Sequence, residues 1–229
     1  MKRTLNYSQL LSLLLAAMVL IAVSCSKDTV KENPEKPLLV GQVTSLTGKV
    51  WMDRNLGASR VATSSTDEHA YGDLYQWGRL TDGHQIRTST TTGTISNLYL
   101  SGHGSFILTS YTPWDWLNPQ KSNLWQGVNG TNNPCPKGFR LPTDDELNAE
   151  QLTWSSNNAT GAFASPLKLT VAGYRKASNG SLTDVGAYGY YWSSKVDVTT
   201  SRYLSFASSG AGTHTYIRAG GFSVRCIKD

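Results

Sequence analysis

Three cysteines are the residues of this sequence with the widest choice of chemistry. Cys135 lies between two prolines in the stretch NPCPKGFRLPTDDEL, residues 133–147. Because Pro134 and Pro136 fix the backbone on both sides, the thiol is held on a rigid turn. Such a mount suits a catalytic nucleophile, and it equally suits one half of a disulfide. No histidine or aspartate stands near Cys135 in the sequence to activate it, which disfavours the nucleophile.

The N-terminal residues predict export from the cytoplasm. Lys2 and Arg3 are followed by an apolar run over residues 10–23, LLSLLLAAMVLIAV. This run is shorter than the roughly 20 residues that a membrane-spanning helix needs. A basic start before an apolar run of about 7–15 residues is typical of a secretory signal.

The residues that end this run, Ala22-Val23-Ser24-Cys25, resemble the lipobox of bacterial lipoproteins. The resemblance implies that residues 1–24 are a cleaved signal peptide and that Cys25 is lipidated. It also implies an outer-membrane lipoprotein of the cell envelope, facing either the periplasm or the surface. Ala22 stands where the family usually has leucine, and an ordinary cleaved signal with an incidental cysteine is the alternative.

The segment after this cysteine predicts a flexible tether over residues 25–37. Its sequence, SKDTVKENPEKP after Cys25, is polar and charged and has almost nothing to bury. Residues 38–229 then form one domain that is long enough for a sizeable core.

With Cys25 assigned to the anchor, Cys135 and Cys226 remain as a pair. Outside the cytoplasm thiols oxidise, and an even pair there predicts a disulfide. In the chain-entropy model a loop of this length stabilises the fold by roughly 4–5 kcal/mol. A disulfide is therefore favoured over a free reactive thiol.

The remaining titratable residues give no pattern for a metal, a cofactor or catalysis. The four histidines lack the spacing of zinc ligands and read as loop or surface residues: His69, His84, His103 and His214. The acidic run after Thr143 is explained by a capping box with Glu146, which predicts a helix to about residue 152. Motifs for a nucleophile elbow or a phosphate loop are lacking, although a triad assembled from distant residues stays open.

The charge of the chain gives no indication of nucleic-acid binding. The formal net charge of +5 falls to +3 once Lys2 and Arg3 are removed with the signal peptide. Lysine and arginine form no stripe along the sequence, so nucleic-acid binding is not predicted.

Three tryptophans in a loop region are the best candidates for ligand binding: Trp114, Trp116 and Trp125. Their flat indole faces suit stacking on sugar rings or anchoring of a protein partner. The alternative is that these side chains pack the loop onto the core. The Gly-, Ser- and Thr-rich residues 81–104 are the region where we expect specificity for a partner.

The secondary-structure elements expected to position these residues predict an α+β fold with few helices. Strands are expected at residues 48–52, 167–174, 190–196, 202–206, 213–218 and 222–227, and a type I′ hairpin turn at Asn179-Gly180. In residues 167–174, Leu167, Leu169 and Val171 are expected to face the core. Residues 80–110 have no helical period and predict a long loop with short strands. Short links between the C-terminal strands predict an antiparallel meander.

Seven motifs in this order resemble the Fibrobacter succinogenes major paralogous domain: VWMDRNLGA, YGDLYQWGR, DWLNPQKSNLWQG, NNPCPKGFRLPTDDEL, LTVAGYR, YGYYWSS and FSVRCIKD. The resemblance covers nearly all of residues 38–229. It implies a C-type-lectin-like fold, distantly similar to the formylglycine-generating sulfatase-modifying domain. A helix then packs beside a twisted antiparallel sheet, long loops decorate one side, and the first and last strands pair, with Trp51 near Val224.

The resemblance implies a scaffold rather than a reaction. Sulfatase-modifying relatives need a functional cysteine pair, and the pair available here lies in motifs that read as structural. Trp192-Ser193-Ser194 stands where sugar-binding lectins have a calcium-ligating triplet, and serine is a poor calcium ligand. We therefore expect a non-catalytic binding module for an extracellular glycan or protein, with a structural subunit of a surface assembly or, less favoured, an enzyme as alternatives.

Overall fold

A computed structural model describes residues 41–229 of the chain. The predicted signal peptide, Cys25 and the predicted tether lie outside the described residues. Within residues 41–229, no helix combines the length and the apolar character needed to cross a membrane.

The described chain has the predicted α+β class, with two α-helices and mostly antiparallel strands. The strands of one sheet, in spatial order, are β1 (Gln42–Thr44), β2 (Val50–Met52), β13 (Ile227–Lys228) and β6 (Phe139–Arg140). Those of a second are β11 (Gly210–Ile217), β10 (Thr200–Ala207) and β9 (Gly189–Asp197). Those of a third are β3 (Tyr75–Gln76), β12 (Gly221–Phe222), β7 (Tyr174–Arg175) and β8 (Leu182–Thr183). The pair β4 (Thr91–Thr92) and β5 (Phe106–Ile107) is parallel.

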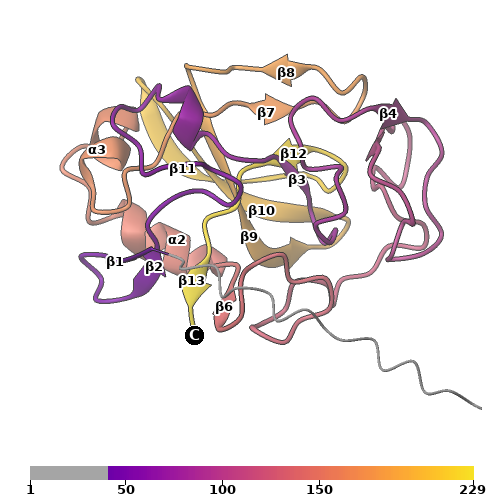
Figure 1. The fold of residues 1–229 in the computed structure, drawn as a ribbon, viewed down its shortest axis with the longest axis horizontal. Helices are drawn as coiled ribbons and strands as arrows, with labels where there is room; N and C mark the ends of the chain where they lie inside the picture. The colour runs from indigo at the N-terminus through magenta and orange to yellow at the C-terminus, as the bar shows by residue number, and fades with distance from the viewer. Residues whose placement is uncertain (1–40) are drawn as a thin grey trace, which may run out of the picture. The chain divides into compact units, whose positions relative to one another are not determined.

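The long strands β9, β10 and β11 form the predicted antiparallel meander (Figure 1). Its last strand differs from the expectation, because β11 begins at Gly210 and not at residue 213. Ala207 pairs directly with Gly210, so Ser208 and Ser209 alone make the turn. Gly210 and Gly212 read as turn residues in the sequence but lie within β11.

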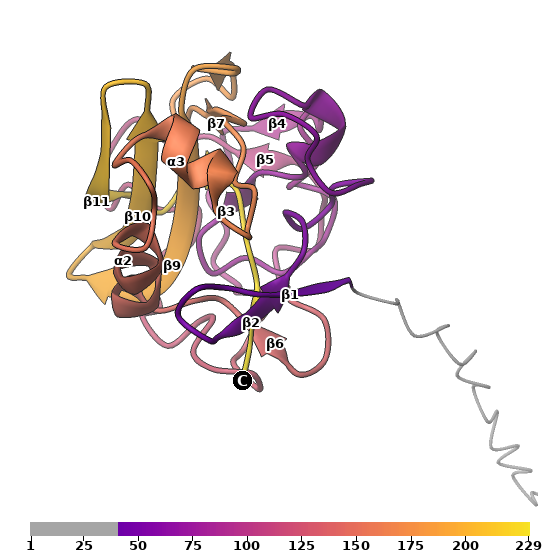
Figure 2. The same cartoon turned by 90° about the vertical axis from the view of Figure 1, so that its left-hand side faces the viewer.

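The helices cover one face of this meander (Figure 2). Helix α2 (Asp144–Gln151) begins at the predicted capping box, in which Thr143 and Glu146 bond reciprocally. Helix α3 (Ala159–Ala164) was not predicted, and the side chain of Asn158 caps it. A short 3₁₀ turn, Glu68–Ala70, is the other helical segment of the described chain.

The core on this face joins the helices to the sheet. Leu147 and Trp154 belong to one buried cluster with Leu204 and Phe206 of β10. Because side chains alternate along a strand, Tyr203 and Ser205 face the opposite side of the sheet.

The last strand of the described chain, β13, pairs with β2, the second strand, so an N-terminal and a C-terminal strand pair as the family resemblance implied. The register differs from the expectation, because Ile227 rather than Val224 lies opposite Trp51. The ladder continues beyond the strands, since the Met52 amide donates to the Cys226 carbonyl at 2.9 Å. Figure 2 shows β1, β2 and β13 together beside β6.

The predicted disulfide joins Cys135 to Cys226, whose Cα atoms are 5.9 Å apart. The bond links the turn before β6 to the segment before β13, across a sequence separation of 91. With both sulfurs bonded to each other, neither thiol is free to act as a nucleophile.

The strand expected at residues 167–174 is wrong for most of its length. Leu167, Leu169 and Val171 are buried as expected, but Thr170 and Ala172, which alternation would place on the opposite face, are buried too. A segment buried on both sides need not form a regular ladder, and only its end, β7, is a strand.

The turn expected at Asn179-Gly180 does close a hairpin, between β7 and β8, but it is not type I′. That type needs positive φ at two consecutive residues, and only Gly180, at 70°, has it. The link is longer, and the Lys176 amide donates to the Ser181 carbonyl across it at 2.9 Å. The side chain of Asn179 instead accepts from the Ser181 amide.

Candidate functional site

Residues 80–110 form the predicted long loop region, in which β4 and β5 are the regular pieces (Figure 1). The segment just before it, around β3, supports this region. Its backbone carbonyls receive hydrogen bonds from tryptophan side chains that come from distant parts of the chain.

Two of the three candidate tryptophans donate hydrogen bonds to the segment around β3 instead of facing a ligand. The indole of Trp116 donates to the Trp77 carbonyl at 2.7 Å, and that of Trp125 donates to the Arg79 carbonyl at 3.3 Å. Both side chains have 0% exposure. The expectation that Trp116 and Trp125 stack on a ligand is therefore corrected, because their rings are enclosed by the core and their N–H groups are already used.

Trp114 differs from the other two, since 39% of its surface is exposed. It lies in a turn whose backbone is closed by a hydrogen bond from its own amide to the Tyr111 carbonyl at 2.9 Å. Tyr111 is exposed as well. Trp114 is thus the member of the predicted trio that can still contact a partner.

Arg79 is the residue that fixes the loop region, and sequence reasoning missed it. Its side chain is fully buried. Its guanidinium group donates at 2.7–3.0 Å to five oxygen atoms: Asp82 Oδ2, Gln76 Oε1, Ser101 Oγ and the carbonyls of His103 and Ser105. An arginine has five N–H donors, so every one of them has a partner.

The charge of Arg79 is kept despite its burial. Desolvation lowers the pKa of Arg79, whereas the charge of Asp82 and the hydrogen bond to it raise that pKa. The guanidinium carbon also lies 5.5 Å from the ring centre of Trp116, within range of a cation–π contact. A buried cation thus holds the backbone of residues 101–105 in place.

Asp82 and His84 form a pair that resembles the acid–base half of a catalytic triad. Nδ1 of His84 lies 2.6 Å from Asp82 Oδ1. The second ring nitrogen, Nε2, accepts a hydrogen bond from the backbone amide of Gln76 at 3.1 Å, so Nδ1 carries the proton. Nε2 has no free lone pair, and the ring has no exposed surface. His84 therefore cannot take a proton from a substrate in this conformation.

The protonation states of this pair follow from burial and from each other. Desolvation lowers the pKa of His84 to about 4, more than the hydrogen bond to Asp82 raises it. Burial alone raises the pKa of Asp82, but His84 and Arg79 together hold it well below its usual range. At neutral pH the site therefore contains a carboxylate, a neutral imidazole and a guanidinium cation.

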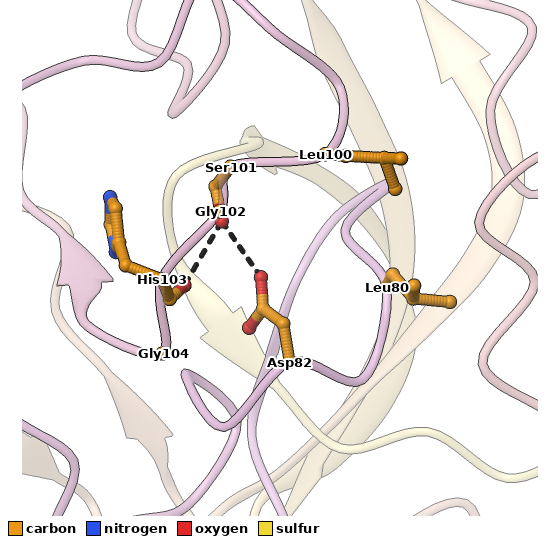
Figure 3. Close-up of a pocket in the computed structure, with 7 residues that line it drawn as sticks. All are labelled: Leu80, Asp82, Leu100, Ser101, Gly102, His103 and Gly104. Carbon is orange, nitrogen blue, oxygen red and sulfur yellow. Dashed lines mark hydrogen bonds between the residues drawn. The ribbon is translucent and has the colours of Figure 1, made fainter. Parts of the chain in front are cut away.

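A pocket of about 450 Å³ opens above this network, between residues 80–82 and residues 100–104. Asp82 lies in its middle and accepts a hydrogen bond from Ser101 at 2.9 Å. The side chains of Leu80 and Leu100 lie on one side of Asp82, and the ring of His103 turns away on the other (Figure 3). The pocket combines an apolar wall with a partly exposed carboxylate.

Three consecutive residues that lead up to the pocket wall expose apolar side chains. Leu98 and Leu100 are 62% and 52% exposed, and Tyr99 between them is 38% exposed. The backbone here is anchored, because the Asn132 side chain donates to the Tyr99 carbonyl at 2.8 Å. Lys121 lies 4.7 Å from the centre of the Tyr99 ring. We call Leu80, Asp82 and residues 98–104 the loop surface.

The other histidines do not come together with acidic residues or cysteines. Within residues 41–229, no group of three or more potential metal-ligating side chains is arranged to hold an ion. His69, His103 and His214 are exposed and lie on separate segments.

The chain was compared with family models, curated proteins and solved structures. No family model, no curated protein and no solved structure matches the chain.

Proposed function

We propose that this chain is a lipid-anchored, non-catalytic binding protein of the bacterial cell envelope, with Cys25 as the anchor. We further propose that residues 38–229 are a C-type-lectin-like domain of the Fibrobacter succinogenes major paralogous family. Three features support the fold assignment: helices beside an antiparallel meander, pairing of the N-terminal strand β2 with the last strand β13, and a long loop region.

The loop surface is the proposed recognition surface for an extracellular glycan or protein. The observation that carries this proposal is the run of exposed apolar residues Leu98, Tyr99 and Leu100, the last of which lines a pocket that holds a carboxylate. Large apolar side chains exposed next to each other on a rigid backbone are characteristic of binding sites. The buried bonds of Arg79 supply the rigidity, which lowers the entropic cost of binding.

The same site argues against catalysis. Its one histidine–carboxylate pair has both ring nitrogens occupied, and both cysteines of the described chain are joined in the disulfide. The polar groups of the site are thus used to hold its shape.

The test is a binding screen with a matched pair of double variants. The full chain, purified in detergent, is applied to an array of neutral and acidic glycans and to a panel of purified extracellular glycoproteins. Leu98→Asn/Leu100→Asn should abolish binding to at least one glycan or glycoprotein that the unmodified chain binds. Leu46→Asn/Leu152→Asn makes the same chemical change at two exposed leucines outside the loop surface and should leave binding intact. Absence of any binding, or equal binding by both double variants, would refute the proposal.

A structural subunit is a second candidate, supported by the edge of the meander. β11 is eight residues long and has β10 as its single neighbour in the sheet of the described chain. Side chains of Gln151 and Asn157 reach one of its carbonyls, that of Ala211, and an edge of this kind can pair with another strand. Sedimentation of the full chain at rising concentration distinguishes the two, because self-assembly through this edge requires growing oligomers and a binding module can remain monomeric.

A further inference from the structure

The face of the meander that is turned away from the helices carries a group of tyrosines. Four of them, from β7, β9, β10 and β11, surround the buried ring of Phe222: Tyr174, Tyr190, Tyr203 and Tyr216. Their ring centres lie 4.8–5.6 Å from that of Phe222. All four are partly exposed, so their rings also form part of the surface. We call them the tyrosine platform.

A hollow of about 240 Å³ lies beside the platform, at the end of the β10–β11 hairpin. Tyr188 and His214 stand at its sides, and Ser205, Gly210 and Gly212 are among the residues that line it. It shares no residue with the loop surface. In both Figure 1 and Figure 2 the β10–β11 hairpin lies on the other side of the described chain from β4 and β5.

The side walls of the hollow continue the aromatic surface of the platform. Tyr188 is 40% exposed, and its ring is stacked on that of Tyr190 with centres 5.9 Å apart. On the opposite side, the His214 ring centre lies 5.9 Å from that of Tyr203. The hollow thus has a flat ring on each side and the platform next to it.

Glycine creates the space between these rings. A Cβ atom on Gly212 would meet only the His214 ring, with the nearest atom at 3.4 Å. Gly212 does not have a positive φ, so other residue types can adopt its backbone conformation. The backbone conformation therefore does not require glycine here, although glycine weakens a strand. The missing side chain leaves the hollow open.

The chemistry of the hollow selects an uncharged, hydroxyl-rich ligand. No lysine, arginine, aspartate or glutamate lines it, so an anion or a cation would find no counter-charge there. Serine and tyrosine hydroxyls and an imidazole offer hydrogen bonds, and the ring faces suit the apolar faces of a sugar. On the platform, burial raises the pKa of Tyr216 to about 12, so its hydroxyl stays protonated at neutral pH.

We propose that the hollow binds one ring of a neutral oligosaccharide between Tyr188 and His214, and that the next rings lie across Tyr203 and Tyr216. The hollow is smaller than the roughly 300–1,000 Å³ of pockets for drug-sized ligands, which fits a single sugar unit. A folded protein partner would instead need about 800 Å² of matched surface, which a hollow of 240 Å³ does not by itself provide. This site is separate from the loop surface and does not depend on the function proposed for it.

Calorimetric titration of the full chain with neutral hexasaccharides of glucose and mannose tests the proposal. At least one should bind, and a hexasaccharide of galacturonic acid should bind more weakly because the hollow offers no positive charge. Gly212→Val fills the hollow and should weaken binding at least about tenfold, while valine suits a strand and keeps the fold. Gly93→Val is the control, because a Cβ atom there meets nothing within 4 Å.

A second variant, Tyr188→Ala, removes an exposed wall without filling the space, and it should also weaken binding. It keeps the test decisive if Gly212→Val does not fold. Failure of every neutral hexasaccharide to bind, or unchanged affinity in the two variants, would overturn the inference. The Leu98→Asn/Leu100→Asn variant should bind these sugars normally, which separates this result from that of the loop surface.

Discussion

Replacing Arg79 by lysine should destabilise the protein although the charge is conserved. Arginine uses five donors at this site, whereas lysine has three on a single nitrogen. At least two of the five acceptors therefore lose their hydrogen bond to this side chain. An acceptor left unsatisfied costs about 1–3 kcal/mol, so we expect a loss of roughly 2–6 kcal/mol in the free energy of unfolding.

The carbonyls of His103 and Ser105 are the acceptors farthest along the chain from Arg79, and residues 100–104 line the pocket described above. The loss should therefore be largest locally, in residues 101–105. Urea unfolding measures the global change, and amide hydrogen exchange at residues 101–105 measures the local one.

Arg60→Lys is the matched control for this change. Arg60 also pairs with a carboxylate, that of Asp67, but about half of its side chain is exposed to solvent. Water can replace the bonds that lysine does not make, so this variant should change stability much less than Arg79→Lys. If the two variants have equal effects, or if exchange in residues 101–105 is unchanged in Arg79→Lys, the role assigned to Arg79 is wrong.

Two further predictions concern the disulfide and a buried acid. Cys135→Ala/Cys226→Ala should lower the free energy of unfolding by about 4 kcal/mol and the melting temperature by roughly 10–15 °C. The reason is that the bond constrains the unfolded chain across 91 residues. A calorimetric midpoint like that of the unmodified protein would contradict this. Burial raises the pKa of Asp115 to about 6, above its usual 3.8, despite Arg218 nearby. Ionisation therefore disfavours the folded state as pH rises from about 4 to 7, by up to roughly 3 kcal/mol. Asp115→Asn should accordingly become more stable relative to the unmodified protein across that range in urea unfolding, and a difference independent of pH would exclude this effect.

Local signals in the sequence were sufficient for part of the fold. The capping box at Thr143 depends on residues three positions apart, and the disulfide followed from having a single remaining pair of cysteines. Helix α3 was missed because its six residues include Gly161 and are too few to display a helical period. The segment 167–173 was misread because alternation of apolar residues indicates a strand only where one face meets solvent.

The candidate site was harder to predict for a physical reason. The loop acceptors of Arg79 lie 22, 24 and 26 positions away in the chain, so no local sequence pattern predicts these hydrogen bonds. Tryptophan raises a similar difficulty, because an indole that stacks on a ligand and one that caps a buried carbonyl look alike in a sequence. That residues 81–104 carry partner specificity stays a prediction; most residues that line the pocket lie in this segment.

Several of the bonds that fix the loop surface end on main-chain oxygen. Arg79 reaches the carbonyls of His103 and of the adjacent Ser105, and Asn132 reaches a third, that of Tyr99. A peptide carbonyl is present whatever the identity of the residue, so the side chains at residues 98–100 can be exchanged without removing these supports. The domain is thus suited to diversification: a library randomised at these three positions should retain one shared backbone while each member displays a different contact surface.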